Sequence, residues 1–178
     1  MKFIFSLLIL FVYSVGIAQT NNLKLNNLLV VGQLDKSEDR FTLEINLTEM
    51  LADAGIKSMA SLNVLKQGSN PVILATDSIQ KMLKSKGIDT YVLVSVRGYD
   101  RQFKPAKNHD SLSAELASGH LFPLYRDEIS SITFEFKFYR NGEFVGYDLV
   151  KLGSVNSRDS VLKKFRKKIG KRILSHWK

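Results

Sequence analysis

The sequence predicts an α/β protein in which a parallel β-α-β-α-β core is extended by an antiparallel β-hairpin, with a C-terminal amphipathic helix packed on the sheet. Three observations predict this fold. Short apolar runs alternate with segments of helical periodicity in the first half of the chain, which is typical of parallel strands joined by right-handed crossovers. Asn141-Gly142 joins two later strands, and residues 160–178 place their apolar side chains on one side of a helix.

The first β-α-β unit spans residues 28–62. The apolar run at 28–32 predicts a buried strand. From Arg40 onward apolar residues recur at spacings of three and four, so we expect a helix that Gly55 ends as its C-terminal cap. The preceding Ser-Glu-Asp at 37–39 offers capping side chains for that helix. Residues 56–62 predict the second strand.

The second helix and the third strand follow a loop. Residues 66–71 have turn-forming composition. Thr76 or Asp77 can cap a helix that Gly87 ends. Residues 91–96 are then almost continuously apolar and β-branched, which is typical of a strand buried on both faces.

Residues 132–152 predict the hairpin. Residues 132–139 alternate strictly, with Ile132 and three phenylalanines on one face. Asn141-Gly142 suits a type I′ turn, because both of its central residues need a positive φ. Residues 144–152 form the return strand.

Residues 160–178 form a basic amphipathic segment that Ser157 or Asp159 can cap. They hold eight Lys or Arg and no acid, whereas residues 19–159 carry 17 basic and 17 acidic side chains. The apolar stripe of the helix is expected to pack on the sheet. The opposite side predicts a basic face for an anionic surface, made of Lys163, Lys164, Lys167 and Lys171. The alternative is an undocked helix lying in a membrane interface.

The N-terminus predicts a signal peptide over residues 1–18. Lys2 precedes an apolar run at 3–13, which is too short to span a bilayer comfortably, and Gly16-Ile17-Ala18 offers cleavage after Ala18. The alternative is an uncleaved anchor. Residues 19–178 then suit a single α/β domain with an insertion at 104–128. The chain contains no cysteine, which excludes disulfides, thiol catalysis and cysteine-based zinc sites.

The first half resembles the small α/β domains of envelope proteins related to the N-terminal domain of TolB and to the curli-secretion lipoprotein CsgG. The resemblance rests on the strand at 29–32, the helix ending Met-Leu-Ala-Asp-Ala-Gly at 50–55, and Lys-Ser-Lys-Gly-Ile-Asp at 84–89 before the strand at 91–94. It covers about residues 28–98. It implies a role in envelope assembly and protein contact rather than catalysis, and it implies no functional residues.

A ligand cleft is one candidate site. In open α/β sheets, ligands bind beyond the carboxyl ends of neighbouring strands. If the first and third strands are neighbours, the loops after them bring together these candidate residues: Asp35, Arg97, Tyr99, Asp100 and Arg101. The alternative is a pair of solvated loops with ordinary ion pairs, each contributing about 0–1 kcal/mol.

The insertion at 104–128 is a second candidate site, because long connections are often functional. A short capped helix is expected at 110–117. The apolar run that follows predicts either a lid on the sheet edge or a protein contact surface, made of Leu121, Phe122, Leu124 and Tyr125. His109, Asp110, Glu115 and His120 match no known metal-ligand spacing, so no metal is expected.

These observations favour a non-catalytic binding or assembly module of the bacterial cell envelope, located in the periplasm and acting through contacts with another envelope protein. One alternative is a small-molecule-binding or hydrolytic enzyme that uses the predicted cleft. Another is a peripheral membrane binder that acts through the basic helix. No catalytic residue, cofactor or nucleic-acid partner is expected, and the oligomeric state stays open.

Overall fold

The computed structural model describes residues 23–66, 68–106, 108–118 and 121–178. They contain one five-stranded sheet of order β2-β1-β3-β4-β5. β1 pairs in parallel with β2 and β3, whereas β3 with β4 and β4 with β5 pair antiparallel. The predicted α/β class, with a parallel start and an antiparallel hairpin, is confirmed. The strands are β1 (Asn27–Gln33), β2 (Lys57–Ala60), β3 (Thr90–Tyr99), β4 (Ser131–Arg140) and β5 (Glu143–Gly153).

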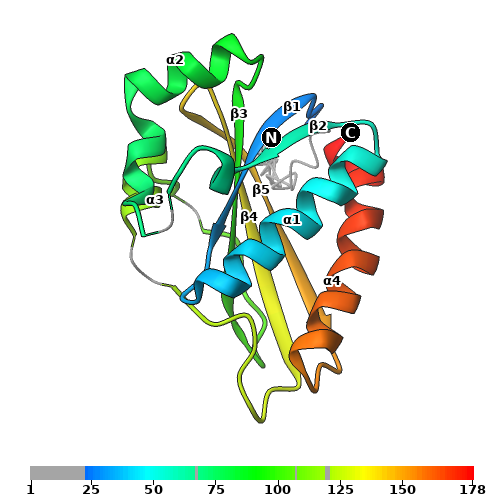
Figure 1. The fold of residues 1–178 in the computed structure, drawn as a ribbon. Coiled ribbons are helices and arrows are strands. Elements are labelled where there is room, and N and C mark those ends of the chain that lie inside the picture. The colour runs from blue at the N-terminus through cyan, green and yellow to red at the C-terminus, as the bar shows by residue number, and fades with distance from the viewer. Residues whose placement is uncertain (1–22, 67, 107, 119–120) are drawn as a thin grey trace, which may run out of the picture.

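Helices cover both faces of the sheet, with α1 and α4 on one face and α2 and α3 on the other (Figure 1). The α-helices are α1 (Ser37–Asp53), α2 (Asp77–Ser85), α3 (Leu112–Ala117) and α4 (Arg158–Arg172). Short 3-10 helices are η1 (Ser61–Asn63) and η2 (Pro71–Ala75), and a π-helical turn, η3 (Ile173–Trp177), continues α4.

The core under α1 and α4 is built on the phenylalanine face of β4. Phe134, Phe136 and Phe138 are fully buried. Phe134 lies 5.0 Å from the Phe165 ring of α4, and Phe136 lies 4.9 Å from the Trp177 ring of η3, measured between ring centroids. The expected packing of the C-terminal helix on the sheet is therefore confirmed.

The core on the opposite face is smaller and lies under α2, α3 and η2. Tyr91 and Leu93 of β3 contribute to it, while Val92 and Val94 belong to the core under α1 and α4. β3 is therefore buried on both faces, as its continuous apolar run predicts. The apolar side chains that the covering helices supply are Leu74, Leu83, Leu112 and Leu116.

Turn and cap chemistry follows the sequence at most element ends. Gly55 and Gly87 end α1 and α2 with φ values of +78° and +80°. Asn141 and Gly142 have φ values of +52° and +84°, which a type I′ turn requires. Ser157 caps α4 in a reciprocal arrangement with the side chain of Ser160.

Three sequence-based predictions about local structure are wrong. Thr76 is at the N-cap position of α2, but no side chain caps that helix, and the Thr76 hydroxyl donates to the Ile73 carbonyl instead. The side chains at 37–39 do not cap α1, whose N-cap is Lys36 without a side-chain bond. Asp39 is held instead by Arg158 of α4, whose Nε lies 2.6 Å from its Oδ1. The second strand ends at Ala60 rather than at 62, because Glu44 accepts hydrogen bonds from Ser61 Oγ and the Leu62 amide and turns the chain into η1.

The predicted signal peptide lies outside the described residues. Among the helices of the described part, none is long and apolar enough to cross a membrane.

Candidate functional site: the carboxyl ends of β1 and β3

The carboxyl ends of β1 and β3 lie side by side, as the cleft hypothesis requires. Gln33, the last residue of β1, is in register with Ser95 of β3. In the sheet order, the chain leaves β1 toward β2 on one side and leaves β3 toward β4 on the other side, so the direction of the connections reverses between β1 and β3. Such a position is where open α/β sheets bind ligands.

A β-bulge at Arg97 separates the residues that the sequence places together. The register between β3 and β4 shifts between Val96 and Gly98, so Arg97 and Tyr99 lie toward opposite faces of the sheet. Tyr99 belongs to the core under α1 and α4. Arg97 lies on the other face, beside Glu135 of β4.

The insertion occupies the crevice between the two strand ends. Phe122 forms a parallel bridge with Leu34, and its carbonyl accepts a 3.5 Å hydrogen bond from the Asp35 amide. Tyr99 donates its hydroxyl to the Pro123 carbonyl, and Leu124 is fully buried. Residues 122–124 therefore fill space that the sequence assigns to a ligand.

Tyr99 is held by packing and by one cation. The Arg126 guanidinium carbon lies 4.4 Å above the centroid of its ring. Burial raises the pKa of Tyr99 to about 12, although the nearby positive charge of Arg126 partly opposes that shift. A phenol with this pKa stays protonated at neutral pH and serves as a hydrogen-bond donor.

Asp100 stabilises a turn. Its φ is +52°, and its Oδ1 accepts hydrogen bonds from the Ser130 hydroxyl and from the Ser130 and Ser131 amides at 2.8–2.9 Å. These hydrogen bonds, led by that of the Ser130 hydroxyl, lower the pKa of Asp100. Asp35 and Arg101 are exposed, whereas Arg97 lines a cavity.

That cavity, of about 200 Å³, contains a cluster of charges beside α3. The Lys137 ammonium lies 2.7 Å from Glu115 Oε1 and 3.5 Å from Glu135 Oε2. Arg97 lies 4.0 Å from the same Glu135 oxygen. The sequence analysis missed Glu135 and Lys137, although two charges on the buried strand β4, opposite its phenylalanine face, were a usable signal.

A second cavity of about 260 Å³ adjoins the first. Gln33, Ser118 and Leu121 line both, and the remaining lining is largely apolar, including Leu34, Pro71, Val72 and Leu116. The two neighbouring cavities are here called together the two-lobed groove, with a charged lobe and an apolar lobe. The groove lies between the strand ends and α3.

The predicted contact surface of the insertion divides into two halves. Leu121 and Phe122 are 45% and 40% exposed at the rim of the groove. Leu124 is fully buried, and Tyr125 is half-buried with its hydroxyl donated to the Asn156 carbonyl. The first two residues are thus available to a partner, while the last two hold the insertion on the sheet.

The lysines of the predicted basic face do not all have the same surroundings. Lys164, Lys167 and Lys171 line one hollow of about 410 Å³ together with Lys168, which the sequence analysis did not single out. Lys164 and Lys168 donate to the Gly153 and Lys151 carbonyls at 2.8 and 2.6 Å. These two lysines therefore satisfy carbonyls of the edge strand β5.

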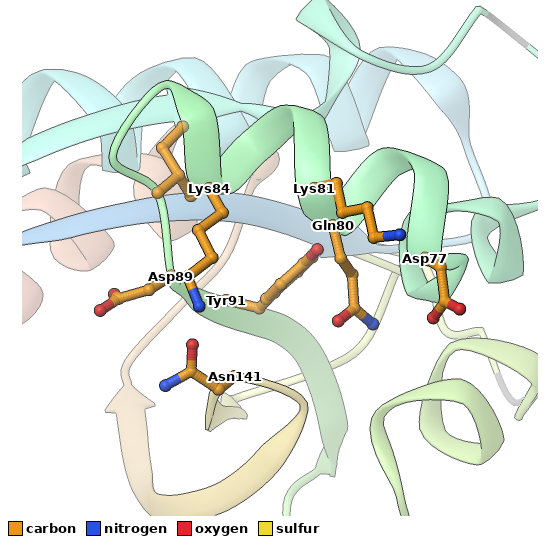
Figure 2. Close-up of a pocket in the computed structure, with 8 residues that line it drawn as sticks. Asp77, Gln80, Lys81, Lys84, Asp89, Tyr91 and Asn141 are labelled. Atoms are coloured by element: carbon orange, nitrogen blue, oxygen red, sulfur yellow. The ribbon is translucent and has the colours of Figure 1, made fainter.

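A further cavity of about 270 Å³ lies between α2 and the hairpin, at the amino end of β3. Figure 2 shows Asp77, Gln80, Lys81 and Lys84 along α2, with Asn141 of the hairpin opposite Lys84. Tyr91 closes the floor by donating its hydroxyl to the Leu74 carbonyl at 3.0 Å. Its two acids and two lysines balance in charge, so this cavity has no excess charge for a ligand.

No group of three acids or histidines within the described residues could hold a metal ion. His120, one of the residues considered at the sequence level, lies outside that part of the chain. His109 instead stacks on Phe144, with ring centroids 3.7 Å apart.

No protein-family model and no curated protein matches the chain. Solved structures of similar shape include lipoprotein GNA1162 from Neisseria meningitidis and the PelC dodecamer from Paraburkholderia phytofirmans. The first is 14% identical, with 84% of this chain and 96% of that chain covered at a TM-score of 0.46. The second is 10% identical, with 89% and 91% covered at a TM-score of 0.44. These values transfer no function to this chain, and the resemblance to TolB and CsgG stays a prediction.

Proposed function

We propose that this protein is a non-catalytic binding module of the bacterial cell envelope that acts through contact with another protein at the rim of the two-lobed groove. The observation that carries this proposal is the exposure of Leu121 and Phe122 beside that groove. Large apolar side chains next to a cavity are typical of protein contact sites.

The backbone around Phe122 is held in place before any partner binds. Its bridge to Leu34 holds it at the end of β1, and the Asp35 amide makes only a long contact of 3.5 Å with its carbonyl. Burial of Leu124 fixes the chain two residues later. A contact surface that is already ordered loses less conformational entropy on binding.

The carboxylates support binding rather than catalysis. Each buried acid of the described residues has a cationic partner: Asp39, Glu44, Glu115, Glu135 and Asp148. Asp100, which the enzyme alternative requires, has its pKa lowered by hydrogen bonds from Ser130 and Ser131. A carboxylate with that environment is a weak base.

Site-specific photo-crosslinking in the cells that make the protein tests the proposal. A benzophenone amino acid at position 122 is expected to give a discrete adduct with another envelope protein. Phe41 is a matched control, because it is 57% exposed on α1, which covers the other face of the sheet. Absence of an adduct at 122, or the same adducts from both positions, would contradict a contact at this rim.

A second candidate function is contact with an anionic membrane surface through α4. Within the described part of the chain, the ammonium groups of Lys163, Lys167 and Lys171 have no hydrogen-bond or ion-pair partner. Near an anionic membrane each such charge contributes about 1 kcal/mol. The clustering of Lys164, Lys167 and Lys171 around one hollow supports this candidate.

Co-sedimentation with vesicles tests this second function. Binding to vesicles that contain an anionic lipid is expected at low salt and is expected to be lost at high salt. A variant with Lys163, Lys164, Lys167 and Lys171 changed to Gln is expected to lose up to about 4 kcal/mol of binding free energy. Equal sedimentation with neutral vesicles, or no effect of the four changes, would contradict it.

A further inference from the structure

The charged lobe of the two-lobed groove has an excess of acid. Asp110, Glu115 and Glu135 line it with only two cations, Arg97 and Lys137. The lobe therefore carries one net negative charge in a chain whose formal net charge is +9. One ammonium, that of Lys137, is shared between two of the carboxylates.

Glu135 is the acid with unused capacity to accept hydrogen bonds. Its side chain is only 6% exposed, and its nearest cationic atoms, on Lys137 and Arg97, lie 3.5 and 4.0 Å from its Oε2. Both distances exceed those of a normal N–H···O hydrogen bond. Within the described residues the Glu135 side chain accepts no hydrogen bond. A buried carboxylate in that condition favours a charged donor from outside the chain.

The neighbouring lobe favours an apolar group, because most of its lining is apolar and the cation in its lining, Arg40, is paired with Glu44 at 3.0 Å. Leu34, Val72 and Leu116 contribute to it, and Leu121 lies where it meets the charged lobe. A ligand that fills both lobes needs a cationic group next to an apolar one. The exposed Phe122 extends the apolar rim beyond the cavities, which favours a polypeptide over a small free amine.

We propose that the two-lobed groove binds a lysine side chain of a partner polypeptide in its charged lobe, with an adjacent apolar side chain of that partner in the apolar lobe. This inference rests on the proposed function and specifies the chemistry of the partner. The lysine ammonium supplies three donors to Glu135 and Asp110, and its four-carbon stem packs against Leu121.

Nuclear magnetic resonance titration of the ¹⁵N-labelled protein tests this inference. The probe is acetyl-leucyl-lysyl-leucine amide, which is expected to give saturable shifts of the Gln33, Ser95 and Ser118 amides. The same peptide with norleucine in place of lysine is expected to bind at least about tenfold more weakly, because it loses a charge-assisted hydrogen bond. A glutamyl peptide is expected to give no saturable shift.

Two variants locate the effect. Glu135→Gln is expected to weaken the lysyl peptide about tenfold, whereas Glu143→Gln, an exposed acid of β5, is expected to leave it unchanged. If the NMR spectrum of Glu135→Gln shows that this variant does not fold, Asp110→Asn replaces it. Asp110 is an exposed residue of the same lobe, and its variant is expected to bind the lysyl peptide more weakly than the wild type does.

Three outcomes would overturn the inference: no saturable shift, equal binding of the lysyl and norleucyl peptides, or unchanged binding in both variants. n-Butylammonium serves as a separate arm. If it binds as tightly as the peptide, the ligand is a small amine and the polypeptide assignment is wrong. A crosslinked partner at position 122 without peptide binding would leave the proposed function standing and remove only the lysine recognition.

Discussion

Asp100 and Glu44 are both acids whose side chains hold backbone segments together. Asp100 accepts from the Ser130 and Ser131 amides across the turn that precedes β4. Glu44 is fully buried and accepts from the Gly32 amide, Arg40, Ser61 and the Leu62 amide. It thereby joins α1 to the ends of β1 and β2. Neither function can be recognised from the identity of the residue, because each depends on distant donors.

Asp100→Asn is expected to lower the melting temperature at neutral pH. The folded-state pKa of Asp100 lies below its ordinary value, so its stabilisation is present above the unfolded pKa and is lost as the pH falls through the folded pKa. Asn tolerates the positive φ of this position. Melting curves from pH 7 to pH 2 should therefore converge for wild type and variant at low pH. A constant difference across this range would contradict the assignment, and Asp127→Asn, an exposed acid, is the control.

Glu44→Ala is expected to reduce the free energy of unfolding by about 3–5 kcal/mol, because it leaves Arg40 without its buried partner. Chemical denaturation measures this change. Glu49→Ala is the matched control on the same helix. Glu49 pairs with Arg166 at 2.9 Å, but both side chains are about half exposed, so a loss of less than about 1 kcal/mol is expected. Similar losses in the two variants would show that Glu44 does not have the role described.

At the scale of elements, the hairpin shows agreement between local sequence and structure. β4 and β5 are joined by Asn141 and Gly142 with positive φ at both positions. A bulge follows in β5, where the register with β4 shifts between Phe138 and Tyr139. The turn is encoded locally, whereas the bulge depends on which side chains the two faces of the sheet must bury.

Gly142→Ala is expected to destabilise the protein by about 1–2 kcal/mol, the cost of placing an L-residue in the left-handed region. A Cβ at Gly142 meets no atom within 4 Å, so this cost arises from the backbone alone. Gly153 has equally open surroundings without a positive φ. Gly153→Ala is therefore expected to change stability by less than about 0.5 kcal/mol. Equal effects at the two positions, measured by urea denaturation, would contradict the turn assignment.

At the scale of the whole molecule, the last residues complete the larger core. The Leu25 amide donates to the Trp177 carbonyl at 2.9 Å, which ties the start of the described chain to its end. Trp177 also donates its indole N–H to Asp148 and packs on Phe136 and Phe138. The apolar side of α4 and η3 is therefore part of the core of the domain. The lysines lie on the opposite side and do not contribute to that packing.

Trp177→Ala is expected to cost about 3–5 kcal/mol, because a large side chain leaves a cavity against the phenylalanine face of β4. Trp177→Phe should cost less, since the ring contacts are partly kept, and it serves as the control. Circular dichroism during denaturation measures both changes. Trp177 is the only tryptophan, so its wild-type fluorescence should follow the same transition. A loss below about 1 kcal/mol in the alanine variant would mean that the tail is dispensable for the fold.

The sequence by itself determined the order and type of the strands and main helices, the hairpin turn and the apolar stripe of α4. These features follow from periodicities and turn residues within a few positions of one another. They placed Phe134, Phe136 and Phe138 on one face and predicted which side of α4 would be buried. The same local rules predicted that Leu121 and Phe122 belong to an apolar stretch, but not which of its residues are exposed.

Only the tertiary structure decided how the candidate site is composed. The bulge at Arg97 sends Tyr99 to the opposite face, and residues 122–124 fill the crevice between β1 and β3. Glu135 and Lys137 meet Glu115 from another part of the chain. Each of these arrangements depends on contacts between residues far apart in the sequence. Such contacts are set by the packing of the whole domain, which local periodicity does not encode.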